Sequence, residues 1–261
     1  MTTDLDHVAL ATRDAGPAVG TLAELGGLVL FGGQAVGFRP MQVLLGDEQA
    51  GMRIELLEPW NVTKNDFLER FLVRHGDGPH HLTFKVDDLD ETLGRLRTAG
   101  YTPVNVDRSD PDWQEAFLLP SEAHGTVVQV AQTVHTFATE SEFLEHVRRH
   151  GADGHPKWWP DPPPAGTRRA VLKRVVMRTS SIDTGIAFFA GLLGGDVEWS
   201  DDGAADLVWP GGSRIRFEAR KGEAPGVDRL EGVVLDGDAV DPSGEPVEVE
   251  VSGTRLLLAP A

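Results

Sequence analysis

Alternating apolar and polar positions predict β-strands at regular intervals along the first half of the chain. In the segment LDHVALAT, Val8 and Leu10 fall on the side opposite His7, the period of two expected for a strand with two distinct faces. A helix is expected from Asp14, which serves as its N-cap, to Leu25, and a glycine pair then ends it. Three further strands are expected at residues 28–31, 38–45 and 52–58. The pattern therefore predicts a βαβββ unit.

The same order of elements recurs after a connecting segment. Residues 64–75 carry phenylalanine and leucine at helical spacing, and a strand is expected at residues 81–86. Residues 88–98 place three leucines on one face of a predicted helix. Short strands are expected at residues 102–106, 115–119 and 126–131. These elements form a second βαβββ unit.

The second half of the chain repeats the first in reduced form. Residues 135–168 hold a short helix, expected at residues 141–149, and a linker rich in proline and glycine. After it, LKRVVMRTSS matches the spacing of LDHVALATRD, SRIRFEAR resembles MRIELLEP, and GTRLLLAP resembles GTVVQVAQ. We therefore predict an α+β fold of paired βαβββ modules in two tandem domains, residues 1–134 and 169–261.

Composition limits the possible functions. The 261 residues include 41 acidic and 24 basic side chains, for a net charge of −17, and such a field repels phosphate backbones and anionic lipid. We therefore expect no nucleic-acid partner and no membrane partner, and a small-molecule substrate instead. The sequence has no cysteine, which excludes disulfides and thiolate ligands, and we expect a cytoplasmic protein. A homodimer and pairing of the two domains within one chain both stay open as expectations.

Two polar pairs stand at equal spacing in these apolar strands. His7 precedes Glu55 by 48 positions, and His81 precedes Gln129 by the same number. Two imidazole nitrogens and two side-chain oxygens suit a divalent cation with open positions for substrate oxygens. In the second half, the corresponding positions are Arg174, Arg216, Leu257 and a residue near Leu230. Only the first domain is therefore expected to hold a metal in this way.

This arrangement resembles the vicinal oxygen chelate (glyoxalase/bleomycin resistance/dioxygenase) superfamily. Within it, FLERFLVRHGDGPHHLTFKVDDLDETLGRLRTAGY is most similar to the methylmalonyl-CoA epimerases, and IELLEP and AHGTVVQ fit the same family. The resemblance implies that His7, Glu55, His81 and Gln129 bind one divalent ion, which is Co, Mn, Ni, Zn or Fe. It also implies an isomerase or epimerase that stabilises the enolate of a small acyl-CoA or dicarbonyl substrate.

One departure from the family bears on the chemistry. The epimerases carry glutamine at the second ligand position and glutamate at the fourth, whereas this chain has Glu55 and Gln129. Epimerisation needs two acid/base groups, and an amide side chain cannot serve as one. If Glu55 is one group, Glu48 or Glu122 is expected to supply the other.

Two other functions compete with this one. His7, His81 and Glu55 alone provide the two-histidine, one-carboxylate set of a non-haem Fe(II) dioxygenase. A metal-free binding or resistance protein is the third possibility, because superfamily members also sequester antibiotics. Among the other histidines, His80 is expected to be structural. His124 is expected to be solvated, but it is close enough to the last strand of the second unit to be a candidate for supporting the ligands.

Overall fold

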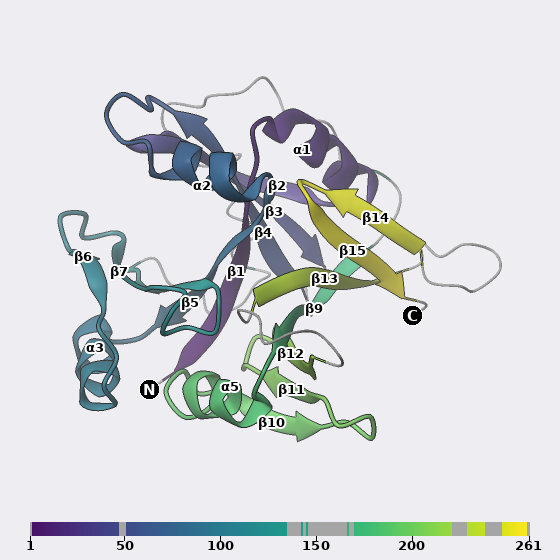
Figure 1. The fold of residues 1–261 in the computed structure, drawn as a ribbon. Helices are drawn as coiled ribbons and strands as arrows, with labels where there is room; N and C mark the ends of the chain where they lie inside the picture. Colours follow the sequence, from purple (N-terminus) through teal and green to yellow (C-terminus); the bar gives the residue numbers. More distant parts are fainter. Residues whose placement is uncertain are drawn as a thin grey trace. The chain divides into compact units, whose positions relative to one another are not determined.

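Two mixed β-sheets form the framework of the protein in a computed structural model (Figure 1). The structure describes residues 2–46, 51–134, 142, 145, 166, 170–220, 229–237 and 247–259. Most of the predicted 141–149 helix and the proline-rich linker therefore lie outside the described residues. None of the described helices is both long and apolar enough to cross a membrane.

The first sheet has eight strands in the order β2-β3-β4-β1-β5-β8-β7-β6. Their bounds are Thr3–Ala11 (β1), Leu28–Gly32 (β2), Gly37–Gly46 (β3), Gly51–Trp60 (β4), Gly78–Val86 (β5), Val104–Asp107 (β6), Gln114–Leu118 (β7) and Val127–Gln132 (β8). The helices are Ala15–Glu24 (α1), Phe67–His75 (α2) and Leu89–Thr98 (α3). Both predicted βαβββ units are confirmed, and their first strands, β1 and β5, are neighbours at the centre of the sheet.

Helix caps at matching positions follow the first strand of each unit. The side chain of Asp14 accepts a hydrogen bond from the Gly16 amide at the start of α1, and that of Asp88 accepts one from the Glu91 amide in α3. Gly26 follows α1 with a positive φ of 91°, which suits glycine because it has no Cβ. The predicted starts of α1 and α3 and the glycine stop after α1 are therefore confirmed.

The second sheet has seven strands in the order β10-β11-β12-β9-β13-β15-β14. Their bounds are Ala170–Thr179 (β9), Asp196–Trp199 (β10), Ala205–Val208 (β11), Arg214–Ala219 (β12), Arg229–Gly237 (β13), Val247–Val251 (β14) and Thr254–Ala259 (β15). One helix, α5 (Ile182–Phe189), follows β9 and begins at Ser181 as its N-cap. After α5 the chain continues through residues 190–193 in hydrogen-bonded turns.

Residue contacts divide the chain into two compact units, and each unit contains strands of both sheets. The first unit comprises residues 1–7, 81–136 and 174–231. Its core includes Phe84 of β5, whose ring lies 5.2 Å from that of Trp209 and 6.0 Å from that of Phe189. All three side chains are buried, and the Trp209 indole donates a hydrogen bond to the Leu193 carbonyl. Aromatic packing therefore joins residues from both halves of the chain in this unit.

The second unit comprises residues 8–80, 137–173 and 232–261. Within it, α1 contacts β14, and the Ala170 amide donates a hydrogen bond to the Leu25 carbonyl. Helix α2 packs through Leu68 and Leu72 on an apolar group that includes Ala9 and Leu57. This packing brings the helix close to the central strands that carry the polar residues described next.

Candidate metal centre

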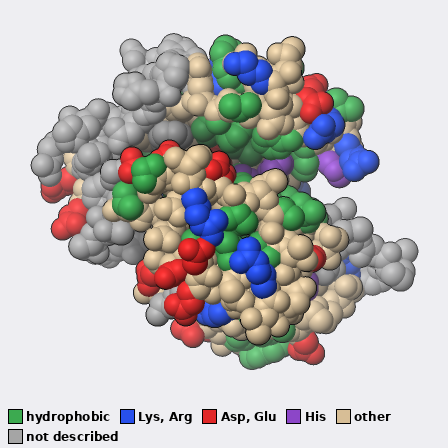
Figure 2. Space-filling model, turned by 90° about the vertical axis from the view of Figure 1, so that its left-hand side faces the viewer, with side chains coloured by type: hydrophobic (Ala, Val, Ile, Leu, Met, Phe, Trp, Pro, Cys, Tyr) green, Lys and Arg blue, Asp and Glu red, His purple; other side chains and the backbone are tan. Residues whose placement is uncertain are grey.

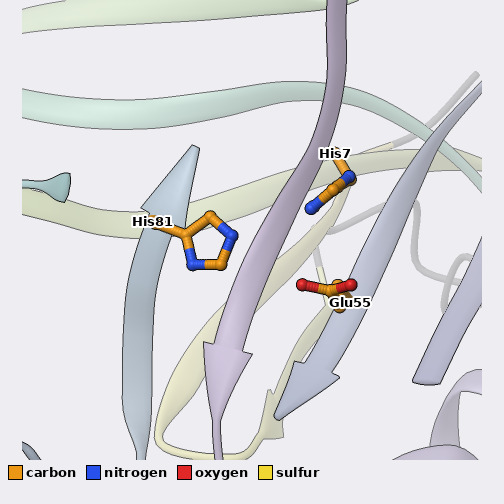
Figure 3. A group of neighbouring side chains, drawn as sticks. All are labelled: His7, Glu55 and His81. Carbon is orange, nitrogen blue, oxygen red and sulfur yellow. The ribbon is translucent and has the colours of Figure 1, made fainter. Parts of the chain in front are cut away.

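Three polar side chains from consecutive strands of the first sheet converge on one point (Figure 3). Glu55 extends from β4, His7 from β1 and His81 from β5, and all three side chains are buried. One candidate ligand atom from each residue lies within 4.8 Å of those of the other two. Two atoms bound to one ion are at most about 4.2 Å apart, twice a bond of about 2.1 Å. Three ligand atoms cannot all be that far apart, and in a tetrahedral site with such bonds they lie about 3.4 Å from one another, so a contraction of at most about 1.4 Å would allow all three to bind one cation.

The orientation of His7 is fixed by its neighbour in the sequence. Its Nδ1 lies 2.8 Å from Oδ2 of Asp6, while Oδ1 of Asp6 lies 2.8 Å from the Lys85 ammonium. A carboxylate only accepts hydrogen bonds, so the proton of the neutral ring lies on Nδ1 and the Nε2 lone pair is retained. Metal-binding histidines are typically oriented by such a carboxylate. Asp6 and Lys85 were missed from the sequence because alternation alone does not show which neighbours a histidine contacts.

Glu55 is also supported by a residue on an adjacent strand. Gln42 of β3 lies directly opposite Glu55 in the β3–β4 pairing, and its Nε2 donates to Oε1 of Glu55 at 3.3 Å. Two imidazoles and one carboxylate are a donor set that suits several divalent ions. The residues present therefore fit a divalent cation in both chemistry and spacing.

Gln129, the fourth expected ligand, has defined contacts within the first sheet. It lies on β8, next to β5, and is buried. Its Oε1 accepts a hydrogen bond from the Thr83 hydroxyl at 2.5 Å, and its Nε2 donates to Oε2 of Glu115 on β7. Its role as a ligand stays a prediction, and the contact with Glu115 was not foreseen.

The carboxylates expected to assist Glu55 lie in different situations. Glu48 lies outside the described residues. Glu122 is half-buried, and its Oε2 accepts a hydrogen bond from the Thr102 amide at 3.0 Å. Glu122 therefore secures a loop, and its catalytic role stays a prediction.

An aromatic group lies in the same unit as Glu55. Phe67 of α2 lies 5.6 Å from Phe38 and 6.0 Å from His80, measured between ring centroids. Burial lowers the pKa of His80 to about 4, although the negative charge of Glu55 acts in the opposite direction. His80 is thus a neutral member of an aromatic group near the carboxylate, as its predicted structural role requires.

Other histidines contribute to packing or lie at the surface. His124 lies 5.9 Å from Phe188 and 6.1 Å from Phe189, so it belongs to the aromatic packing of the first unit. His75 is exposed at the end of α2.

The face of the molecule in Figure 2 shows acidic and basic side chains interspersed with hydrophobic ones.

In the second sheet, an ion-pair network occupies the positions of two ligands. Arg216, which corresponds to Glu55, contacts Asp206 at 3.0 Å, Asp202 at 2.5 Å and Glu218 at 3.3 Å. Arg174, which corresponds to His7, lies 3.5 Å from the same Asp206. Burial lowers the pKa of Arg216, but the carboxylates of Asp206 and Asp202 outweigh it and raise the value. Salt bridges with Asp206 therefore form at both of these positions.

The strand pairing also identifies the equivalent of His81 in this copy. Gln129 lies opposite Thr83, two residues after His81, and the corresponding Leu257 lies opposite Val234. The equivalent of His81 is therefore Gly232, in agreement with the expected position near Leu230.

Known proteins resemble both the sequence and the fold. Residues 6–117 match the Glyoxalase/Bleomycin resistance protein/Dioxygenase superfamily, which confirms the expected resemblance for this segment. A hypothetical protein from Staphylococcus aureus is 13% identical, with a TM-score of 0.67 over 100% of both chains, and so shares the fold. None of the curated proteins matches the chain.

Methylmalonyl-CoA epimerases are among the solved structures that match about half of the chain. The enzyme from Streptomyces coelicolor is 22% identical and covers 53% of this chain and 99% of its own, with a TM-score of 0.47. The enzyme from Mycobacterium tuberculosis is 24% identical and covers 50% of this chain and 88% of its own, with a TM-score of 0.44.

Proposed function

We propose that the protein is a metal-dependent isomerase or epimerase that removes and returns the α-proton of a small acyl-CoA or related dicarbonyl compound. The observation that carries the proposal is the buried group of His7, Glu55 and His81, whose ligand atoms lie within 4.8 Å of one another. The superfamily match of residues 6–117 and the epimerase-like sequence around His81 support it. The expected cytoplasmic location and the possible homodimer stay predictions.

The chemistry needs an electrophile beside a base. A divalent ion bound by the two histidines and Glu55 would polarise the substrate carbonyls and favour the enolate. Glu55 is the one carboxylate of the group, so we assign it one of the two acid/base roles that epimerisation needs, and we assign the other to Glu48 or Glu122. The C–H electron pair enters the enolate when the proton leaves and returns to the carbon when it is restored. The aromatic group of Phe38, Phe67 and His80 suits an apolar acyl substituent near this carboxylate.

Proton exchange tests this proposal directly. Methylmalonyl-CoA is incubated in deuterated water with the protein and Co²⁺ or Mn²⁺, and the α-proton is followed by NMR. We expect its loss at a rate above that of a metal-free sample, and Glu55→Gln is expected to lower that rate by about 10²–10⁴-fold. No exchange above background with either ion would overturn the assignment of this substrate.

The three side chains of His7, Glu55 and His81 also favour a second function. Two histidines and one carboxylate are the ligand set of non-haem Fe(II) oxygenases. On this alternative, oxygen is consumed with a catechol or an α-keto acid when Fe²⁺ is supplied, and the acyl-CoA α-proton does not exchange. Fe²⁺-dependent oxygen uptake without proton exchange would replace the first function by the second.

A further inference from the structure

The amide of Gln129 is held from two sides by strands that flank β8. Thr83 on β5 donates its hydroxyl proton to Oε1, and Glu115 on β7 accepts from Nε2. Thr83 and Gln129 are directly paired, and His81 lies two residues before Thr83, so all three side chains project from one face of the sheet. The amide oxygen therefore lies on the side of the histidine strand, and the amide nitrogen lies on the side of β7.

Glu115 determines this orientation because of the chemistry of its carboxylate. One oxygen, Oε2, accepts hydrogen bonds from both the Trp113 indole at 2.7 Å and the Gln129 amide. An ionised carboxylate has no proton to donate, so only the NH₂ end of Gln129 can face it. The inverted amide would place two acceptors in contact, and a glutamate at position 129 would place two negative charges there.

We propose that Glu115 is a positioning residue that directs the Oε1 atom of Gln129 toward the metal held by His7, Glu55 and His81. This inference rests on the proposed metal-dependent function. It explains how a glutamine on β8 can serve as the fourth metal ligand, where the epimerases carry a glutamate. An amide is a neutral ligand that binds through oxygen alone, and an amide free to rotate would offer its nitrogen half of the time. The carboxylate that orients a ligand is typically worth 10–100-fold in metal affinity.

Binding of Co²⁺ to the full-length protein tests the inference without a substrate. Affinity is measured by competition with a chelator in the wild type, Glu115→Leu, Gln129→Leu and the double variant. We expect about a tenfold or greater loss in each single variant and little further loss in the double variant, because both changes remove the same oriented oxygen. Glu115→Gln keeps an acceptor oxygen for both donors, and we expect its affinity to stay within about threefold of the wild type.

The variants separate positioning from other roles of Glu115. If the charge of Glu115 acted on the metal directly, Glu115→Gln and Glu115→Leu would lose the same affinity, and that result would overturn the inference. Unchanged affinity in a folded Glu115→Leu protein, or independent and additive losses in the two single variants, would overturn it as well. Circular dichroism and urea unfolding of the metal-free proteins establish that each is folded. A wild-type protein that binds no Co²⁺, Mn²⁺, Ni²⁺, Zn²⁺ or Fe²⁺ would instead refute the proposed function.

Discussion

Replacing Asp6 by asparagine tests how the protein prepares His7 for a metal. The Asp6 side chain is only 6% exposed, and its two oxygens contact His7 and Lys85 at 2.8 Å each. Asparagine keeps the shape but offers one oxygen and one NH₂ group. If the NH₂ group faces His7, the ring proton moves to Nε2, the atom on which a metal would bind. If it faces Lys85, two donors meet in a nearly buried position.

The expected loss follows from the contacts that are removed. Loss of the carboxylate that orients a metal-binding histidine costs about 10–100-fold in affinity, or about 1.4–2.7 kcal/mol. A charged hydrogen bond contributes about 1.5–3 kcal/mol, which falls in the same range. We therefore expect Asp6→Asn to bind Co²⁺ about 30-fold more weakly than the wild type.

Competition titration with a chelator measures this loss, and Lys85→Met is the matched control. Lys85 is 34% exposed, and exposed ion pairs contribute at most about 1 kcal/mol, so its variant should lose less than about fivefold. Urea unfolding of the metal-free proteins separates affinity from folding. A folded Asp6→Asn protein whose Co²⁺ affinity stays within about twofold of the wild type would refute the reasoning.

Three further predictions concern stability. The pKa of His80 falls from 6.5 to about 4, so the unfolded state binds more protons between these values, and the free energy of unfolding falls as pH drops from 6.5 to 4. Urea unfolding at several pH values should show a smaller fall for His80→Asn than for the wild type. The same dependence of the unfolding free energy on pH in both proteins would contradict this prediction. Phe84→Ala should lower the free energy of unfolding in urea by about 3–5 kcal/mol, because the ring is fully buried beside Trp209. A decrease of less than about 1 kcal/mol would argue against this packing. Asp206→Asn should lower the unfolding free energy by about 2 kcal/mol because Arg216 loses its buried partner, and an unchanged urea midpoint would show that this pair is dispensable.

Local signals in the sequence were sufficient for much of the fold. Alternation located the central strands, the acidic cap at Asp14 located the first helix, and the leucine spacing located the helix over residues 88–98. Equal spacing selected His7, Glu55 and His81, which the structure brings together. These features depend on neighbours in the chain or on a repeated topology, so the sequence carries them directly.

Contacts between strands could not be predicted in the same way. Glu115 meets Gln129 across the β7–β8 pair, and Lys85 meets Asp6 across β5 and β1. Such contacts depend on strand order and on rotamers, which alternation leaves open. The compact units that draw residues from both halves of the chain likewise depend on tertiary packing and not on periodicity.

Metal stoichiometry tests the central claim most directly. The wild type, His7→Ala and His81→Ala are loaded with a divalent ion, dialysed and measured by elemental analysis, with His75→Ala as the control for an exposed histidine. We expect about one equivalent per chain in the wild type and in His75→Ala, and a large loss in the other two variants, because each removes one of three clustered ligands. A wild type without bound metal, or full retention in His7→Ala and His81→Ala, would contradict the account.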